Sequence, residues 1–372
     1  MNHYMPVRLC TGEHIVEKNA AFFSRIGKRC VIITGKSSAV KSGALDDVVC
    51  ALNRCSIPFL VFDGIASNPS VKSCSQAGAA ARDFGADFII GIGGGSALDA
   101  AKAAAVFSAN STLDEDGFYA KEWGRTPLPI LLVGTTSGTG SEVTKVSVLT
   151  DSRGRKHSIH DDRLFAQAAF GDPRYTMGLP RPVTLSTGID ILSHCAESWF
   201  SRKADENSRA FSVRGIQLLF DPLYAAASGN ELSLSQRGQL YDASILGGMA
   251  ICNTGTCFPH NVGYYLTESR GIPHGFASAA FLPAMLSLIA ERMPAAAECF
   301  YHELAIPADR LLQLVNACLP ELHVSMAEEE ILSTLPRWEN NNSVRNTCCD
   351  ISTADIQTIL EKQFSETEGR TT

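Results

Sequence analysis

Residues 88–102 have the sequence FIIGIGGGSALDAAK. The apolar, β-branched run at residues 88–92 predicts a buried strand, which leads directly into three glycines and an alanine-rich helical stretch. Without Cβ atoms, residues 93–95 can bring backbone N–H groups close to a ligand. The helix that starts near Ser96 directs its positive end to the same place. The stretch therefore predicts a phosphate site, although a plain tight turn is the alternative, because the G-x-G-x-x-G fingerprint is absent.

Strands and helices alternate through the first half of the chain. Further strands are predicted at residues 30–34, 59–62, 130–133 and 146–149, with helices at 38–52 and 71–84. Such alternation is typical of a parallel sheet covered on both faces by helices. A second Ser/Thr/Gly loop, GTTSGTGSEVT at residues 134–144, also follows a strand. Because ligands bind at the carboxyl ends of parallel strands, two such loops in one sheet favour a nucleotide site.

The pattern changes after Pro180. Strand patterns largely disappear, and apolar residues recur at the helical period, as they do between residues 189 and 199. The helix in that region is expected to have Ser186 or Thr187 as its N-cap. The second half of the chain is therefore predicted to be mostly helical.

The length of 372 residues favours two domains. We predict an α/β dinucleotide-binding domain with a parallel, Rossmann-like sheet at residues 1–179, and an all-α metal-binding domain at residues 180–372. The formal charge of −7 gives no attraction for nucleic acid or anionic lipid. The apolar stretch at residues 276–290 is too short and too interrupted to span a bilayer. Residues 1–8 lack a signal-peptide pattern, and the 12 scattered cysteines suit reduced thiols, so a cytoplasmic protein is expected.

Four side chains in the second half carry groups that divalent transition metals prefer. Asp190 and His194 are four residues apart in TGIDILSHCAE, so in a helix they lie on one face about one turn apart. His260 and His274 follow, each beside a proline or a glycine. Taken singly, each group has an ordinary explanation, either a surface Asp–His contact or a buried, hydrogen-bonded histidine. One carboxylate and three imidazoles beside a nucleotide-binding half instead predict a divalent metal site.

Together these motifs resemble the iron-containing (group III) alcohol dehydrogenases, which share a fold with dehydroquinate synthase and glycerol dehydrogenase. The resemblance covers nearly the whole chain, in the order of residues 30–36, Asn68-Pro69, GGGSALDAAK, TTSGTGSEVT, TGIDILSHCAE and GIPHG. It implies that the metal, usually Fe²⁺ and sometimes Zn²⁺, is held by Asp190, His194, His260 and His274. It also implies that a nicotinamide dinucleotide is lined by Gly94, Gly95, Ser96, Asp99, Thr135, Thr136 and Ser141, with Asn68, Lys156 and Leu179 as neighbours.

The chain departs from the family pattern at two places. Many members carry an acidic residue after the first strand, where it accepts hydrogen bonds from the ribose 2′-hydroxyl, whereas this chain has Gly35, Lys36 and Ser37. Loss of the carboxylate and gain of a cation and a hydroxyl favour a 2′-phosphate, so NADP(H) is expected over NAD(H). Several relatives also have a proton-relaying histidine where this chain has Tyr264. Either the phenol takes that role, or the relay passes through water and the cofactor ribose.

The expected function is hydride transfer between nicotinamide C4 and a small alcohol or aldehyde whose oxygen is polarised by the metal. Alternatives of the same fold are a polyol dehydrogenase, a cyclase, a transhydrogenase, and a reductase of a small anionic aldehyde of the phosphonate or sulfonate type. For the anionic substrate, the nearby cations would come from Arg181, Arg270 and Lys156. An alternative from another class is a non-catalytic protein that binds nucleotide and metal. Relatives are commonly dimers or larger, so a homodimer is expected.

Overall fold

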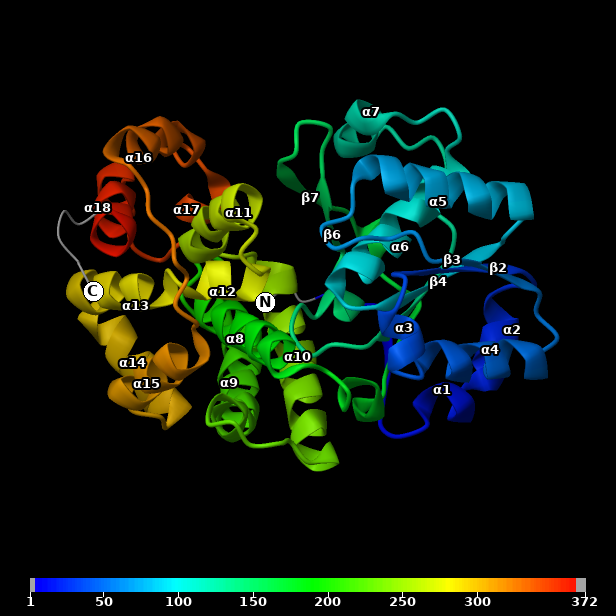
Figure 1. The fold of residues 1–372 in the computed structure, drawn as a ribbon, viewed down its shortest axis with the longest axis horizontal. Helices are drawn as coiled ribbons and strands as arrows, with labels where there is room; N and C mark the ends of the chain where they lie inside the picture. Colours follow the sequence, from blue (N-terminus) through cyan, green and yellow to red (C-terminus); the bar gives the residue numbers. More distant parts are fainter. Residues whose placement is uncertain (1–3, 366–372) are drawn as a thin grey trace.

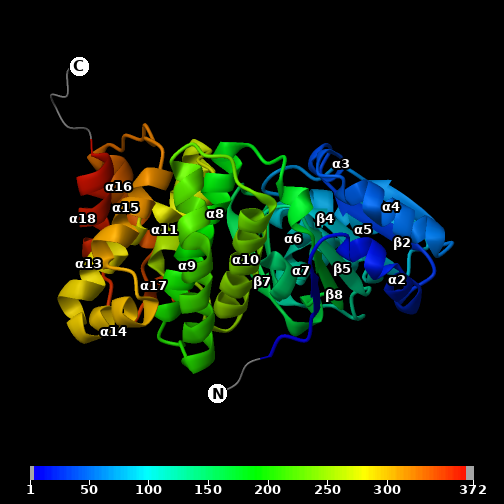
Figure 2. The same cartoon turned by 90° about the horizontal axis from the view of Figure 1, so that it is seen from below.

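The computed structural model describes residues 4–365. The first part of the chain forms an α/β half and the second part a helical half, which lie side by side along the long axis of the molecule (Figures 1 and 2). The predicted fold class is therefore confirmed. The division of the chain between residues 179 and 180 stays a prediction.

Six parallel strands form the sheet of the α/β half, in the order β1–β8–β5–β4–β2–β3. They are β1 (Arg8–Thr11), β2 (Cys30–Thr34), β3 (Phe59–Phe62), β4 (Phe88–Gly93), β5 (Ile130–Gly134) and β8 (Ala168–Gly171). Every residue of the four central strands is buried, as expected for strands that helices cover on both faces.

Successive side chains of these strands enter two separate cores. Ile89 packs with the helices on one face of the sheet, and Ile90 packs with the helices on the other. The first face is covered by α5 (Val71–Phe84), α6 (Gly95–Ala109) and α7 (Glu115–Ala120). The second face is covered by α1 (Ile15–Lys18), α2 (Ala20–Ile26), α3 (Ser38–Lys41) and α4 (Ala44–Arg54).

The chain reverses its direction across the sheet between β2 and β4. Strand β3 lies on one side of β2, and β4 and all later strands of the sheet lie on the other side. In open α/β sheets, such a reversal leaves a crevice outside the carboxyl ends of the two strands, where ligands bind. Thr34 is paired with Ile92, so the segment that starts at Gly35 and the glycines after β4 leave the sheet next to each other.

Three local expectations were wrong or incomplete. Residues 146–149 were expected in the main sheet, but β6 (Val146–Thr150) pairs antiparallel with β7 (Lys156–His160) in a separate hairpin. Its alternating burial is that of a half-covered strand. The helix expected at 38–52 is broken into α3 and α4 at Gly43, which has a φ of 78°. Strands β1 and β8 were missed.

The helical half begins with α8 (Arg181–Trp199). The expected N-cap at Ser186 or Thr187 is wrong, because the helix starts a full turn earlier and has a proline in its first turn, where the missing N–H is no loss. The other helices are α9 (Glu206–Ala227), α10 (Leu234–Thr254), α11 (Phe258–Arg270), α12 (His274–Ala279), α13 (Leu282–Arg292), α14 (Pro294–Leu304), α15 (Ala308–Cys318), α16 (Glu328–Thr334), α17 (Asn342–Arg345) and α18 (Thr353–Phe364).

Within residues 4–365, one stretch, His274–Arg292, is long and apolar enough to cross a membrane by length and composition alone. It is 61% buried inside the fold and is divided between α12 and α13. Such burial is typical of a helix in a protein core, so the stretch gives only weak support for a membrane span.

Candidate active site

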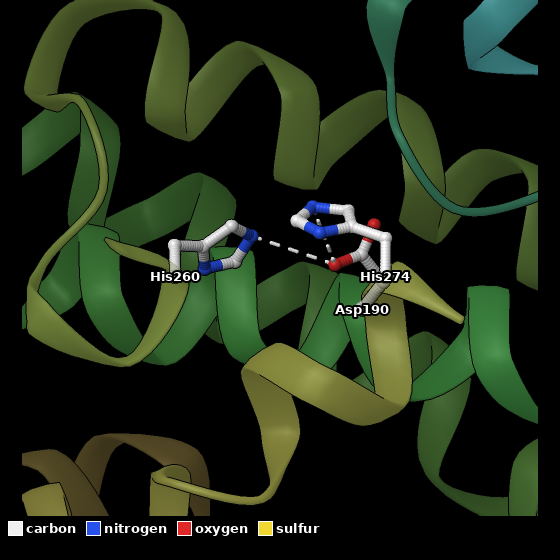
Figure 3. A group of neighbouring side chains, drawn as sticks. All are labelled: Asp190, His260 and His274. Atoms are coloured by element: carbon white, nitrogen blue, oxygen red, sulfur yellow. Dashed lines mark ion pairs between the residues drawn. The ribbon is translucent and has the colours of Figure 1, made fainter. Parts of the chain in front are cut away.

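Three imidazole nitrogens surround one oxygen of Asp190. Oδ1 of Asp190 lies 3.4 Å from Nε2 of His260 and 3.8 Å from Nε2 of His274, and Figure 3 shows both rings directed at the carboxylate. The same oxygen lies 3.9 Å from Nε2 of His194. Donor atoms that bind one ion at about 2.1 Å lie roughly 3.0–3.5 Å apart. The four groups are therefore spaced nearly as a single ion requires.

The tightest group consists of Asp190, His260 and His274, each of which offers one donor atom within 4.8 Å of the others. His194 joins this group from the side. Its ring stacks on that of His260, with centroids 4.7 Å apart and planes 22° apart. The structure thus brings all four expected metal ligands into one cluster, with His194 the least tightly placed.

Helix α8 and the start of α12 position two of these side chains by a close contact. A Cβ atom on Gly275 would lie 1.8 Å from the backbone oxygen of Ser186 and 3.0 Å from Cβ of Asp190. Only glycine permits this approach, which brings the first turn of α12 against α8. The neighbouring His274 is thereby held beside Asp190.

The donor atoms of the cluster fit a bound cation. Among the described residues, Oδ1 of Asp190 and Nε2 of His260 are buried without a hydrogen-bond partner. Buried polar atoms are nearly always paired, so two unpaired polar atoms that face each other call for a shared partner. A carboxylate oxygen and imidazole nitrogens suit Fe²⁺ or Zn²⁺.

Burial and charge set the protonation of the cluster. Burial lowers the pKa of His274 to about 3 and also lowers that of His194, which favours the neutral, metal-binding form of both rings. Burial acts in the same direction on His260, but Glu197 and Asp190 outweigh it and raise its pKa to about 10. Burial opposes ionisation of Asp190, yet the surrounding histidines hold its pKa below the ordinary value.

Glu197 is a residue of the site that the sequence reasoning missed. It is fully buried, and its Oε1 lies 2.5 Å from Nδ1 of His260. Glu197 follows Asp190 by seven residues and His194 by three, so all three lie on one face of α8. This spacing was a sequence signal that Glu197 faces the site, although its partner His260 is brought close only by the fold.

The two glycine-rich loops lie against each other at the carboxyl edge of the sheet. A Cβ atom on Gly94 would lie 3.0 Å from Oγ1 of Thr136, and one on Gly95 would lie 2.7 Å from Cγ2 of Thr139. The backbone N–H of Thr135 donates to the oxygen of Gly93 at 2.9 Å. The two loops therefore form one continuous surface at the N-terminus of α6.

Free polar groups line the second loop. Among the described residues, Oγ1 of Thr135 and Oγ of Ser137 are buried without a hydrogen-bond partner. Hydroxyls of this kind, next to a helix N-terminus and closely packed glycines, fit a phosphate-bearing ligand. Thr135 was an expected cofactor residue, and Ser137 was not.

Asp99 and Ser141, both expected at the cofactor, are hydrogen-bonded to each other. Oγ of Ser141 donates to Oδ1 of Asp99 at 2.6 Å, and the N–H of Val148 donates to Oδ2 at 2.9 Å. Lys102, which the sequence reasoning quoted without assigning a role, is fully buried and donates to Ser141 O and Oγ, both at 2.8 Å. It also donates to the oxygen of Val146 at 2.7 Å. One turn of α6 therefore fastens the second loop to the β6–β7 hairpin.

The remaining expected cofactor residues are not equally close to these loops. Oγ of Ser96 accepts from the N–H of Asn68 at 3.3 Å, which places Asn68 at the start of α6. Gly35 follows β2 at the crevice, with Lys36 and Ser37 exposed. Leu179 is half-buried in the connection to α8, where its N–H donates to the backbone oxygen of Thr176 at 3.2 Å.

Lys156 and Tyr264 connect the β6–β7 hairpin of the α/β half with the histidine cluster. The ring of Tyr264 stacks on His274 with centroids 5.4 Å apart, and Nζ of Lys156 lies 5.6 Å from the centre of the same tyrosine ring. The backbone N–H of Lys156 donates to Oε1 of Glu268 on α11 at 2.9 Å. Burial lowers the pKa of Lys156. The β6–β7 hairpin thus brings a cation from the α/β half close to the histidines.

Two family models match consecutive parts of the chain. Residues 6–173 match the iron-containing alcohol dehydrogenase model, and residues 184–336 match the C-terminal model of the Fe-containing alcohol dehydrogenase family. The long-chain-alcohol dehydrogenase 1 of Geobacillus thermodenitrificans is 32% identical over 318 residues, which cover 84% of this chain and 80% of that protein. The chain belongs to the iron-containing alcohol dehydrogenase family. This confirms the resemblance found in the sequence.

Solved structures of iron-containing alcohol dehydrogenases share the fold. One from Thermotoga maritima superposes with a TM-score of 0.89 and 33% identity, covering 98% of this chain and 99% of that chain. A sulfoacetaldehyde reductase from Bifidobacterium kashiwanohense, solved in complex with NAD⁺, superposes with a TM-score of 0.85 and 25% identity over 98% of this chain and 99% of that one. As a member of this family, the protein is an oxidoreductase of the metal-dependent, NAD-linked alcohol dehydrogenases that acts on alcohols or aldehydes.

Proposed function

We propose that this alcohol dehydrogenase transfers hydride between nicotinamide C4 and a small alcohol or aldehyde at a metal site made by Asp190, His194, His260 and His274. The observation that carries the proposal is the convergence of three Nε2 atoms on one buried oxygen, at 3.4–3.9 Å. A divalent ion held there, Fe²⁺ or Zn²⁺, supplies a Lewis acid that polarises the substrate oxygen, and the nicotinamide gives or accepts the hydride.

The solvent exposure of the ligand side chains indicates from which side a substrate can reach the site. The side chain of His274 is 27% exposed, whereas those of Asp190 and His260 are 3% and 2% exposed. Substrate therefore approaches on the side of His274. The buried side chains keep water from the rest of the site and preserve the donor geometry, which strengthens electrostatic interactions with a bound substrate.

We assign Tyr264 to the catalytic group because its ring stacks on His274 and also lies close to Nζ of Lys156. There the phenol can donate a proton towards the substrate oxygen or orient water that does so. Replacing Tyr264 with Phe keeps the ring and removes only the hydroxyl. A drop in kcat of at least about tenfold with unchanged metal affinity supports a proton-transfer role, and an unchanged kcat excludes one.

We propose NADP(H) as the preferred cofactor. Gly35 and the exposed Lys36 and Ser37 leave the sheet at the crevice between β2 and β4, where a dinucleotide ribose lies in folds of this kind. A cation and a hydroxyl in place of a carboxylate favour a 2′-phosphate. Preference for NAD(H), the cofactor in the structure of the sulfoacetaldehyde reductase, is the alternative outcome.

The function is tested by anaerobic reconstitution. Protein stripped of metal is loaded with Fe²⁺ or Zn²⁺, and the absorbance at 340 nm is followed with NADPH or NADH against small aldehydes. Oxidation of the cofactor that requires both metal and aldehyde supports the proposal. Tight cofactor binding without turnover, for every metal and aldehyde, contradicts it and favours the non-catalytic alternative.

A small anionic aldehyde is the second candidate substrate, and Lys156 is the observation that favours it. Of the cations expected near the metal, Arg181 donates to the oxygen of Ala226 at 2.7 Å, and Arg270 is held by Glu330 at 2.6 Å. Those two arginines are therefore occupied elsewhere, and only Lys156 reaches the histidine cluster. Replacing Lys156 with Met should reduce kcat/KM for a sulfonated aldehyde much more than for a neutral aldehyde of the same length. An equal loss for both substrates contradicts the anionic assignment.

We also propose a homodimer in the cytoplasm. All 12 cysteines are free in the structure, including the buried Cys74, Cys195 and Cys257, which suits a reducing compartment. The dimer rests on the family resemblance alone. Sedimentation of the purified protein at micromolar concentration tests it, and a monomeric mass contradicts it.

A further inference from the structure

The carboxylate of Glu197 bridges two helices of the metal site. Its Oε1 faces Nδ1 of His260 at 2.5 Å, and its Oε2 accepts a hydrogen bond from the backbone N–H of Cys257 at 2.7 Å. The side chain is fully buried, so these two partners satisfy it in place of water. Glu197 lies on α8, while Cys257 and His260 lie at the start of α11.

The contact with Nδ1 determines which nitrogen of His260 is free. An ionised carboxylate only accepts hydrogen bonds, so Nδ1 must carry the proton. The lone pair of the neutral ring is then on Nε2, the atom that lies 3.4 Å from Asp190 Oδ1. A histidine whose other nitrogen donates to a carboxylate is held in one tautomer and one orientation and becomes a stronger metal ligand.

The contact with Cys257 fixes the position of the helix that carries His260. Cys257 is the N-cap residue of α11, and its own side chain makes no capping hydrogen bond. Glu197 supplies this cap from α8 and places a negative charge at the positive end of α11. Asp190 and Glu197 both lie on α8. Asp190 faces Nε2 of the His260 ring, and Glu197 faces Nδ1.

We infer that Glu197 is the positioning residue of the metal site, which holds His260 as an Nε2 ligand and locks α11 to α8. The inference rests on the metal site proposed above. It assigns Glu197 no contact with the ion or the substrate. Its loss should therefore weaken metal binding without removing a ligand.

The substitution Glu197→Gln separates positioning from packing. An amide has the size of the carboxylate but offers one acceptor and one donor group, whereas the site presents two donors, His260 Nδ1–H and Cys257 N–H. Gln therefore either loses the cap of α11 or donates to Nδ1 and moves the proton of His260 onto Nε2. Both results weaken the metal site.

The experiment measures the Zn²⁺ dissociation constant by chelator competition, together with the melting temperature of the metal-free protein. Glu197→Gln should raise the dissociation constant about 10- to 100-fold. The matched control is Glu142→Gln, because Glu142 is also a buried carboxylate but bonds Tyr241 at 2.9 Å, away from the histidines. The control should lower stability and leave the dissociation constant within about threefold.

The outcomes distinguish this inference from the proposed function. Wild-type affinity in Glu197→Gln, with a lowered melting temperature, overturns the inference and leaves the metal site standing. Failure of the wild-type protein to bind Zn²⁺, or equal Zn²⁺ affinity in the wild-type protein and His260→Ala, contradicts the metal site itself. If Glu197→Gln does not fold, Glu197→Asp takes its place, because the shorter carboxylate cannot reach both partners. Unchanged affinity in Glu197→Asp overturns the inference, and a loss of tenfold or more supports it.

Discussion

His194 and His260 stack with their ring centroids 4.7 Å apart, and both rings present Nε2 to the same oxygen of Asp190. This parallel arrangement joins α8 to α11 through two imidazoles. It explains how His194 can share a metal with the tighter group formed by Asp190, His260 and His274.

The stacked geometry predicts that His194 is a full ligand. His194→Ala should weaken Zn²⁺ binding by at least about 100-fold, comparable to His274→Ala, because removal of a ligand costs more than removal of its support. His323→Ala is the control, since His323 is exposed and paired with Glu321 at the surface. Chelator competition measures all three proteins. A His194→Ala affinity close to that of the control would reduce the site to three protein ligands.

Replacement of Gly275 is predicted to destabilise the fold and to weaken metal binding. In Gly275→Ala the new Cβ would meet the Ser186 oxygen at 1.8 Å, so α12 must move away from α8. We expect a loss of about 1–3 kcal/mol in the free energy of unfolding, with weaker metal binding as His274 moves. The comparison is Gly238→Ala on α10, where the nearest atom is 4.0 Å away and alanine favours the helix. Chemical denaturation measures both variants, and equal stabilities would disprove the packing argument.

Lys102 and Asp99 are predicted to be strongly coupled. Lys102→Met leaves the Asp99 carboxylate without its buried cation 3.7 Å away, and should lower the free energy of unfolding by roughly 3–5 kcal/mol. The double variant, Asp99→Asn with Lys102→Met, should be more stable than the single lysine variant, because no unpaired charge remains. A double-mutant cycle in denaturant measures the coupling. Additive effects of the two changes would mean that the pair acts independently.

Sequence patterns predicted the central elements and failed where the pattern was weak. The bounds of β2, β3 and α5 agree with the runs predicted at 30–34, 59–62 and 71–84. Strand β8 was missed because its sequence, AAFG, has no β-branched residue, so only its pairing between β1 and β5 defines it.

The residues of the candidate site were likewise predicted from the sequence only in part. The metal-binding residue types were legible, because one carboxylate and three histidines are rarely grouped by chance. Glu197 and Lys102 were not assigned roles, because their partners, His260 Nδ1 and the Ser141 backbone, are brought close only by tertiary packing. The expected cofactor residue Leu179 remains a prediction for the same reason.

Cofactor preference is predicted to depend on the residue after β2. Gly35→Asp should shift kcat/KM from NADPH towards NADH by at least about tenfold, because a carboxylate repels a 2′-phosphate and accepts hydrogen bonds from a 2′-hydroxyl. Lys36→Ala is the companion variant, and it should weaken the binding of NADPH while changing the binding of NADH little. Steady-state kinetics with both cofactors measure the shift. A wild-type enzyme that already prefers NADH would overturn the assignment of NADP(H).

The most direct test of the account is the position of the metal. Crystals of the protein loaded with Zn²⁺ are measured on both sides of the zinc absorption edge, and the anomalous difference map locates the ion. The account predicts one dominant peak about 2.0–2.2 Å from Asp190 Oδ1 and from Nε2 of His194, His260 and His274. A dominant peak elsewhere, or one that contacts fewer than three of these side chains, would contradict it.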